Sequence, residues 1–200
     1  MTEVLLATRN KGKVKEFQSL LDGLGLTFRT LDDFPNTAEV REDGTSFEAN
    51  AIKKASEYSK ATGMIAIADD SGLVVDALDG GPGVYSSRYA GDAADDDDNN
   101  EKLILAMKGF PKGRRGAAFV CVVAAARPDG STITSEGRCE GEIISSKKGG
   151  GGFGYDPLFY IPGFGCTMAE LASDKKNEIS HRGKAVKKFK DRFLDFSGSP

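Results

Sequence analysis

Residues 4–13 read VLLATRNKGK, and the prediction of the fold starts from them. This stretch consists of a short apolar run followed by a polar turn, and the turn leads into Val14, Phe17 and Leu21, which are spaced as on one face of a helix. The predicted order is therefore strand, tight turn, helix. Such a turn directs backbone N–H groups and the positive end of the helix toward one point, which suits an anionic group. An ordinary connecting turn with exposed lysines is the alternative.

Strand and helix patterns alternate along the rest of the chain, and the class we expect is therefore α/β, or mixed α+β. Short apolar runs predict strands, and apolar residues at helical spacing predict helices. Strands are expected at 27–31, 64–68, 73–75, 117–125, 131–139 and 158–161, with a turn at 69–72 and a glycine-rich loop at 147–157. Helices are expected from Thr45 or Ser46, over 99–107 after the acidic run 95–98, from a capping box at 167–170, and from Ser180.

Length and composition place the chain among globular proteins. Its 200 residues correspond to one domain, or to one domain with two lobes. Hydrophobic residues make up 39% and charged residues 28%, close to the average for such proteins. The chain has 27 basic and 30 acidic residues, so its net charge is not positive and no overall positive field exists to hold a nucleic-acid polymer. A phosphate group must therefore be bound by a local cluster.

The start of the chain and its cysteines predict a cytoplasmic location and no membrane partner. The apolar start is too short for a signal peptide, and no stretch reaches the roughly 18 apolar residues that cross a bilayer. Cys121, Cys139 and Cys166 are odd in number and form no CxxC pair, as expected of reduced thiols. A single histidine, His181, cannot form a multi-histidine site. A metal would then be held by oxygen, which favours Mg²⁺ or Mn²⁺.

Two adjacent carboxylates, Asp69 and Asp70, follow a buried strand pattern. Successive side chains of a strand point to opposite faces, so only one of the two can enter a given site. A carboxylate at this place can bind a hard cation and accept a proton from water. The alternative is that both merely form a turn. Glu42 completes such a site only if it lies near Asp70; otherwise it is an ordinary acid near the start of a helix.

The glycine-rich loop carries an aromatic residue, Phe153, beside Tyr155 and Asp156. These residues could stack on a nucleobase and accept its N–H groups, whereas loop packing is the alternative. The loop matches GxGxxG only because a run of glycines does so by chance, and Pro157 stands where a dinucleotide-binding helix would continue. No Walker A motif is present, which disfavours a P-loop ATPase.

His181 and Arg182 are adjacent at the start of the last predicted helix. Two donors beside a planar ligand would favour a ring carbonyl over an amino group. A surface pair with no ligand is the alternative.

Six motifs in collinear order resemble the inosine triphosphate pyrophosphatase family, also called Ham1-like. Each motif alone is weak evidence, but together they extend from about residue 4 to about residue 193. They read ATRNKGK at 7–13, FEANA at 47–51, ADDSGL at 68–73, PGVYSSR at 82–88, GGFGYDP at 151–157 and ISHRG at 179–183.

This resemblance implies a fold and an activity. The fold would be a single nucleotide triphosphate pyrophosphatase domain over 1–200, with a long central mixed sheet and two lobes enclosing a nucleotide cleft. The activity would be magnesium-dependent hydrolysis of ITP, dITP and XTP to the monophosphate and pyrophosphate, which removes deaminated purines from the nucleotide pool. The protein would be a homodimer.

The resemblance also implies roles for individual residues. Asp70 would bind magnesium and accept the proton from water, Glu42 would be a second magnesium ligand, and Asp69 would stabilise the turn. Arg9 departs from the small residue expected before Asn10. The substrate-binding residues would be Thr8, Arg9, Asn10, Lys11, Gly12, Lys13 and Lys54 for the triphosphate, Ser71 for the nucleotide, and Phe153, Gly154, Tyr155, Asp156, Lys176, His181 and Arg182 for the base and sugar.

Two other functions stay open at the level of sequence. The first is a related nucleotide pyrophosphatase that acts on other modified bases, pyrimidines included. The second is a nucleotide-binding regulator without catalysis, although the presence of both Asp70 and Lys13 favours an enzyme.

Overall fold

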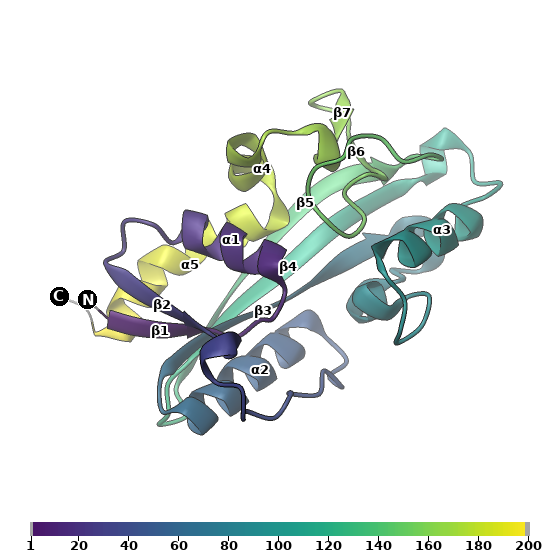
Figure 1. Cartoon of the computed structure of the whole chain (residues 1–200). Helices are drawn as coiled ribbons and strands as arrows, with labels where there is room; N and C mark the ends of the chain where they lie inside the picture. The colour runs from purple at the N-terminus through teal and green to yellow at the C-terminus, as the bar shows by residue number, and fades with distance from the viewer. Residues whose placement is uncertain (1, 199–200) are drawn as a thin grey trace. The chain divides into compact units, whose positions relative to one another are not determined.

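The structure is a computed structural model that describes residues 2–198 (Figure 1). Strands and helices alternate in the first half, and strands dominate the middle of the chain. The strands are β1 (Thr2–Leu6), β2 (Leu26–Thr30), β3 (Ile65–Val75), β4 (Gly116–Ala126), β5 (Thr132–Ile143), β6 (Phe159–Ile161) and β7 (Cys166–Thr167). The α-helices are α1 (Lys11–Leu20), α2 (Phe47–Thr62), α3 (Asp96–Ala106), α4 (Ser173–Ile179) and α5 (His181–Ser197).

The strands form one mixed sheet. Its seven strands are ordered β2-β1-β3-β4-β5-β6-β7. Strand β1 pairs in parallel with β2 and β3, whereas β6 pairs antiparallel with β5 and β7. The expected mixed α/β class is confirmed. Within the described residues, no helix is long and apolar enough to span a membrane.

Strand β3 corrects the sequence prediction. A strand ending at residue 68, a turn at 69–72 and a second strand were expected, but a single strand runs unbroken over Ile65–Val75. Asp69 and Asp70 therefore lie in its middle. Both side chains have partners on neighbouring elements, so two buried carboxylates are accommodated without a break in the strand.

The contacts divide the chain into two compact units. Unit 1 takes its described residues from Met1–Asp70, Cys121–Gly137 and Arg182–Pro200, and unit 2 consists of Ser71–Val120 and Arg138–His181. Strand β3 passes from unit 1 into unit 2 directly after Asp70.

Unit 1 contains two hydrophobic clusters, on opposite faces of its strands. One cluster joins Ile67 of β3 to Phe17 of α1 and Phe189 of α5. The other joins Ala66 and Ala68 of β3 to α2. Figure 1 shows α2 on one side of β1 and β3, with α1 and α5 on the other. Because side chains alternate along a strand, Asp69 shares the face of Ile67, and Asp70 shares the face of Ala68.

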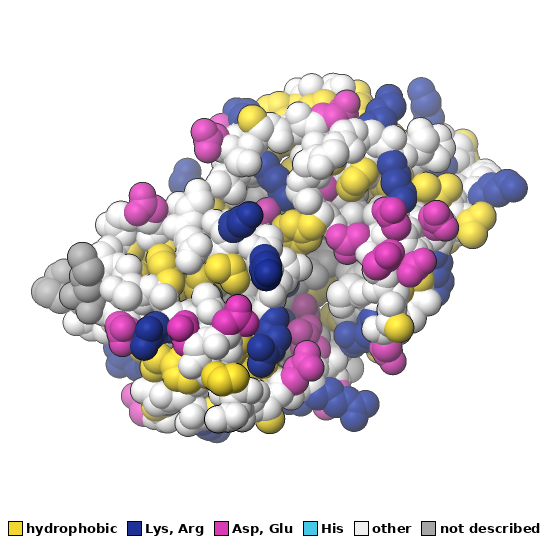
Figure 2. Space-filling view, in the orientation of Figure 1, with side chains coloured by type: hydrophobic (Ala, Val, Ile, Leu, Met, Phe, Trp, Pro, Cys, Tyr) yellow, Lys and Arg dark blue, Asp and Glu magenta, His cyan; other side chains and the backbone are white. Residues whose placement is uncertain are grey.

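Unit 2 has a core that includes Leu103 and Met107 beside Phe119 and Phe159. Helix α3 begins after Asp95, whose side chain accepts the Asp98 N–H at 2.9 Å in a capping box. The acidic run 95–98 is exposed, and Figure 2 shows acidic side chains gathered there. The prediction of a solvated acidic helix start is confirmed, although the helix begins three residues earlier than expected.

Other element boundaries agree with the sequence or differ by one turn. Ser46 caps α2, as predicted, by accepting the Ala49 N–H at 3.1 Å. The predicted hairpin of long strands is formed by β4 and β5, and the Arg127 N–H donates across the turn to the Ser131 carbonyl. The capping box at 167–170 starts a 3₁₀ turn, not an α-helix. Helix α4 begins only at residue 173.

Candidate active site

The turn between β1 and α1 is fixed by side chains of its own. Asn10 is the N-cap of α1, and its Oδ1 accepts the Lys13 N–H at 3.1 Å. The Oγ1 of Thr8 accepts the Asn10 N–H at 3.2 Å. Arg9 and Lys11 are exposed, and Arg9 Nη1 lies 3.9 Å from Asp32 Oδ1. The strand, turn and helix predicted from the sequence are confirmed, and the turn presents the positive end of α1.

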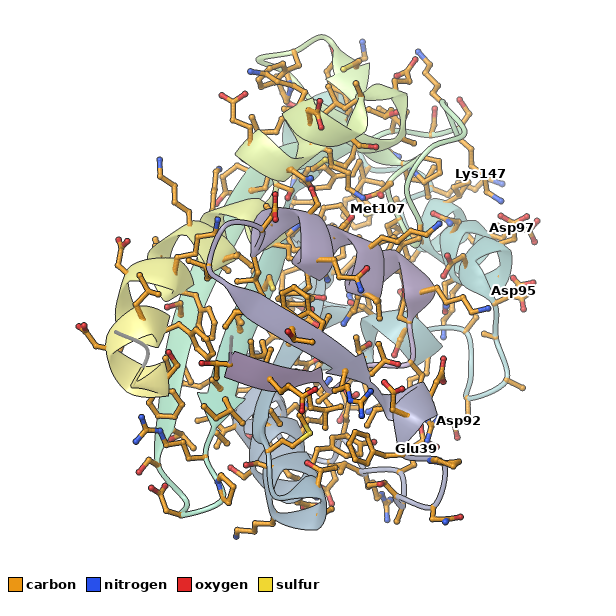
Figure 3. The ribbon with its side chains drawn as sticks, turned by 60° about the vertical axis from the view of Figure 1, so that its left-hand side comes forward. Glu39, Asp92, Asp95, Asp97, Met107 and Lys147 are labelled. Atoms are coloured by element: carbon orange, nitrogen blue, oxygen red, sulfur yellow. The ribbon has the colours of Figure 1, made fainter. Side chains whose placement is uncertain are left out.

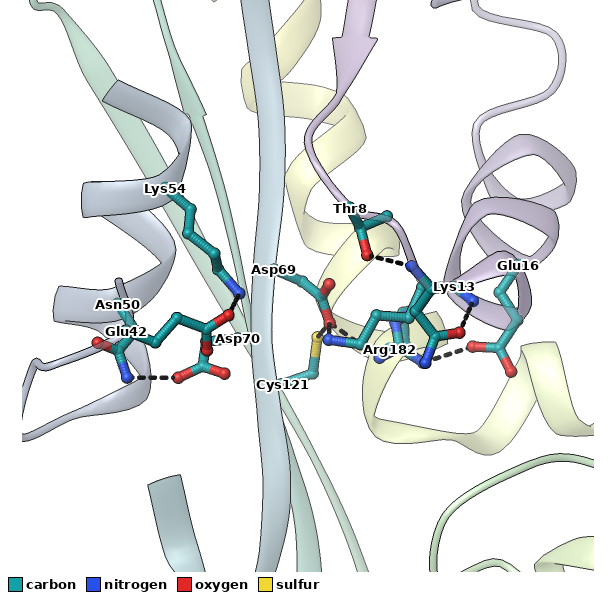
Figure 4. A network of polar contacts seen from close by, with 11 residues as sticks. Thr8, Lys13, Glu16, Glu42, Asn50, Lys54, Asp69, Asp70, Cys121 and Arg182 are labelled. Carbon is teal, nitrogen blue, oxygen red and sulfur yellow. Dashed lines mark hydrogen bonds and ion pairs between the residues drawn. The ribbon is translucent and has the colours of Figure 1, made fainter. Parts of the chain in front are cut away.

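Asp69 points toward α1 and α5 and forms ion pairs with two positively charged side chains (Figure 4). Its Oδ2 lies 3.1 Å from Lys13 Nζ and 2.8 Å from Arg182 Nη2. The Asp69 carboxylate is wholly buried. Burial alone would raise its pKa, but Lys13, Arg182 and Lys54 together hold the pKa of Asp69 far below the ordinary value. The sequence-based role of Asp69 in a turn is wrong, because it lies in mid-strand and joins two cations.

Arg182 is enclosed by carboxylates. Its second nitrogen, Nη1, donates to Glu16 of α1, and only 1% of its side chain is exposed. Burial opposes its charge, but Asp69 and Glu16 raise the pKa of Arg182 above the ordinary value. The prediction that Arg182 donates to a base stays a prediction, and its donors are held by carboxylates in this structure.

Asp70 points toward α2, into different surroundings. Its Oδ2 accepts an N–H of Asn50 at 2.9 Å, and Lys54 Nζ lies 2.9 Å from Glu42 Oε1 beside it (Figure 4). Burial raises the pKa of Asp70 to about 6, and the charge of Glu42 adds to the rise, while Lys54 and Asn50 oppose it. The sequence placed Glu42 and Lys54 with Asp70 only through the family resemblance, and the structure brings all three together.

Asn50 is a residue of this cluster that the sequence analysis missed. It is fully buried, and its Oδ1 accepts the Gly44 N–H at 2.8 Å while its amide donates to Asp70. Asn50 and Lys54 are four residues apart on α2, so both face β3. The signal available in the sequence was the asparagine of the FEANA motif, which stands four residues before Lys54 and so on the same helix face.

The donor set of Asp70 and Glu42 fits a hard divalent cation. The charge of Glu42 raises the pKa of Asp70, an effect that a bound cation would relieve, and oxygen ligands are those that Mg²⁺ prefers. Residues 2–198 contain no group of three or more His, Cys, Asp or Glu side chains able to hold a metal. Mg²⁺ is commonly bound by one or two carboxylates together with water and substrate phosphates, so two carboxylates meet its needs.

In unit 2 the predicted base-binding residues gather around Phe153. The Oδ2 of Asp156 accepts the Phe153 N–H at 3.0 Å and pairs with Lys176 Nζ at 2.7 Å. Lys176 Nζ lies 4.8 Å from the centre of the half-buried Phe153 ring. Gly152 has a φ of +74°, and a Cβ there would lie 2.0 Å from Asp156 Oδ2, so this position requires glycine.

The remaining predicted residues of unit 2 have structural partners. The Tyr155 hydroxyl is buried and donates to the Ser86 carbonyl at 2.8 Å. His181 is buried and stacks on Phe119, with ring centres 4.8 Å apart. Ser71 follows Asp70 on β3 and is half-buried.

Comparison with known proteins shows the family to which the chain belongs. The chain matches the Ham1 family over residues 4–192 and belongs to it. It is 53% identical over 191 residues to a dITP/XTP pyrophosphatase of Geobacter sulfurreducens, covering 96% of both chains. It is 55% identical over 186 residues to one of Desulforamulus reducens, covering 93% of this chain and 92% of that one.

A solved structure agrees with the fold. The HAM1 protein of Coxiella burnetii is 40% identical and superimposes with a TM-score of 0.89. The match covers 98% of this chain and 100% of the other.

Proposed function

We propose that this protein hydrolyses ITP, dITP and XTP to the monophosphate and pyrophosphate, and so removes deaminated purines from the nucleotide pool. The single observation that carries the proposal is the Asp70 carboxylate, buried beside Glu42 and Lys54 with a pKa of about 6. Two relatives that match this chain over more than nine-tenths of its length are dITP/XTP pyrophosphatases, which gives the substrate class.

The triphosphate binds at the first turn of α1 and at two lysines. The Thr8–Lys13 turn offers backbone N–H groups and the positive helix end, and the side chains of Arg9 and Lys11 are exposed there. Lys13 and Lys54 carry charge toward β3 from opposite sides. These groups offset the charge that develops on the leaving pyrophosphate.

Asp70 is the proton acceptor for water that attacks the α-phosphorus. A pKa near 6 leaves the carboxylate ionised at neutral pH and more basic than an ordinary aspartate, as a general base requires. The Asn50 amide and the Lys54 ammonium orient Asp70 and Glu42. Asp70 and Glu42 would hold Mg²⁺, or Mn²⁺ in its place, which supplies charge neutralisation to the phosphate oxygens when bound.

The base and sugar bind to residues around the glycine-rich loop. Phe153 stacks on the purine, and the amides and carboxylate of Gly154, Tyr155 and Asp156 lie beside it, with Ser71 contacting the nucleotide. Lys176 holds the base and sugar, and His181 donates to the oxygen that distinguishes hypoxanthine and xanthine from adenine. Arg182 donates to the same oxygen only after releasing Glu16 or Asp69, which accept from its Nη1 and Nη2. Support comes from the packing of Phe153, Asp156 and Lys176 against one another.

A homodimer in the cytoplasm is the remaining part of the proposal. It rests on the membership of the chain in the Ham1 family and on the features of its sequence.

Release of pyrophosphate from ITP, dITP, XTP, ATP and dCTP tests the function, with Mg²⁺, with Mn²⁺ and with a chelator. We expect release from the first three nucleotides only, and loss of release with the chelator. Preference for dCTP would indicate a pyrimidine enzyme. Tight binding of ITP without turnover in Mg²⁺ would indicate a regulator and contradict the proposal.

A further inference from the structure

Helix α3 holds both backbone polar groups of Gly154 in the glycine-rich loop. The Asp96 carboxylate accepts the Gly154 N–H at 2.7 Å, and the Asn100 side-chain amide donates to the Gly154 carbonyl at 2.9 Å. Asp96 and Asn100 are four residues apart, so they lie on the same face of α3. Both backbone polar groups of one loop residue are thus fixed by one helix.

Gly154 follows Phe153 directly, so these two bonds determine where the aromatic ring lies. Gly154 has a φ of +61°, a conformation that glycine adopts without strain and from which it can also rotate away. Asp156 accepts the Phe153 N–H and also pairs with Lys176, whose ammonium lies over the Phe153 ring. The backbone of Phe153 is therefore fixed at its own N–H and again at the next residue.

We propose that Asp96 and Asn100 are positioning residues that hold Phe153 ready to receive a purine base. The proposal rests on the proposed function, because it requires Phe153 to contact the base. Residues 149–152 are all glycine, and the Gly151 N–H is already bonded to the Ala169 carbonyl at 3.0 Å. Without the two bonds to Gly154, the segment that carries Phe153 would lose restraints that must otherwise be supplied on binding. A loop fixed beforehand avoids that entropic cost and binds more tightly.

The same helix offers a matched control for each residue. Asp97 is next to Asp96 in the first turn, but its carboxylate pairs with Lys147 at 2.8 Å, and both side chains are exposed (Figure 3). Asn99 is as buried as Asn100, but it bonds the Ala90 N–H and the Ser87 carbonyl. Neither control removes a bond to Gly154: Asn99→Ala loses contacts outside the loop, and Asp97→Ala loses only the exposed contact to Lys147 at the start of the loop.

The experiment compares the Asp96→Ala and Asn100→Ala variants with Asp97→Ala and Asn99→Ala. The first pair is expected to raise KM for ITP about 3- to 10-fold each, with kcat changed less than about twofold, because each variant removes one of the two bonds to Gly154. Asn100→Ala also removes the bond from the Asn100 amide to the Asp96 carbonyl within α3. The controls should keep KM within about twofold. Asp96→Asn retains an acceptor oxygen and should restore most of the affinity.

Inorganic triphosphate, which has no base, separates loop positioning from general damage. Its inhibition constant should be the same for all four variants, because it binds only the phosphate site. An equal loss of triphosphate inhibition in Asp96→Ala and Asn100→Ala, or a KM no higher than in the controls, would overturn the proposal. Phe153→Ala must raise KM as well. If it does while Asp96→Ala and Asn100→Ala do not, Phe153 contacts the base as proposed and only the positioning role of Asp96 and Asn100 is wrong. Absence of ITP turnover by the wild-type protein would overturn both.

Discussion

The two sides of strand β3 treat adjacent aspartates in opposite ways. On the side of α1 and α5, Asp69 is wholly buried between Lys13 and Arg182, and its pKa is far below the ordinary value. On the side of α2, Asp70 receives one amide hydrogen bond beside the carboxylate of Glu42, and its pKa rises to about 6. Burial raises the pKa of both carboxyl groups; its effect prevails at Asp70, whereas at Asp69 the charges of Lys13 and Arg182 outweigh it.

The opposite pKa shifts have opposite consequences for stability. A carboxyl group whose folded-state pKa is lowered stabilises the fold above its unfolded pKa, and this contribution is lost as the pH falls. A group whose pKa is raised costs stability at neutral pH, and this cost disappears as the pH falls through the folded and then the unfolded value. Asp69 should therefore stabilise the protein, whereas Asp70 is held ionised at a cost in stability, which the proposed role of Asp70 as a general base would explain.

The largest expected effect is on turnover by Asp70→Asn. This variant keeps the size of the side chain and one acceptor oxygen for Asn50 but removes the charge and the basicity. We expect kcat for ITP to fall by about 10²- to 10⁴-fold, as typical of losing a general base, with further loss from weaker metal binding. Steady-state pyrophosphate release measures kcat, and ITP binding by calorimetry should remain detectable. A kcat near that of the wild-type protein would remove Asp70 from catalysis.

The next effect is on stability, through Asp69→Asn. The substitution leaves the buried Arg182 and the half-buried Lys13 without their shared carboxylate, and it should lower the free energy of unfolding by about 3 kcal/mol. Urea unfolding at neutral pH measures this loss. Asp43→Asn is the control, because Asp43 pairs with Lys53 at 2.6 Å on the surface and its loss should barely change stability. If both variants lowered the free energy of unfolding equally, the buried Asp69 would stabilise the fold no more than the exposed Asp43, which would contradict the account.

A smaller effect is expected at Glu16, the second anion of Arg182. Glu16→Gln retains an acceptor oxygen for Nη1, and Asp69 still neutralises the guanidinium. The free energy of unfolding should fall by about 1 kcal/mol. If urea unfolding shows Glu16→Gln to be as damaging as Asp69→Asn, the two carboxylates share the task equally, and Asp69 is not the principal anion on its side of the strand.

The sequence predicted local features well. The strand, turn and helix of the first 20 residues, the cap at Ser46 and the acidic start of α3 all depend on neighbouring residues, and all are confirmed. The break predicted within β3 is wrong because polar residues at 69 and 70 resemble a turn unless distant partners are known. One such chain of contacts links Asp69 to Arg182 and Arg182 to Glu16, which is 166 residues away from it. Separations of that size leave no local pattern.

The candidate site was also predicted only in part, for the same reason. Asp70 and Phe153 could be singled out by residue type and motif, but the roles of Asn50, Asp96 and Asn100 depend on single hydrogen bonds between segments. The sequence likewise could not predict that Arg182 pairs with Asp69 and Glu16.

The most direct test of the contrast is the free energy of unfolding of Asp70→Asn in urea at pH 7.5, with a chelator present. Because the ionised Asp70 is costly in the fold, this variant should be more stable than the wild-type protein by about 1 to 3 kcal/mol. The gain should shrink as the pH is lowered from 7.5 through 6 toward 4, where wild-type Asp70 becomes protonated. A loss of stability like that expected for Asp69→Asn would contradict the account, since both sides of β3 would then hold their carboxylate in the same way.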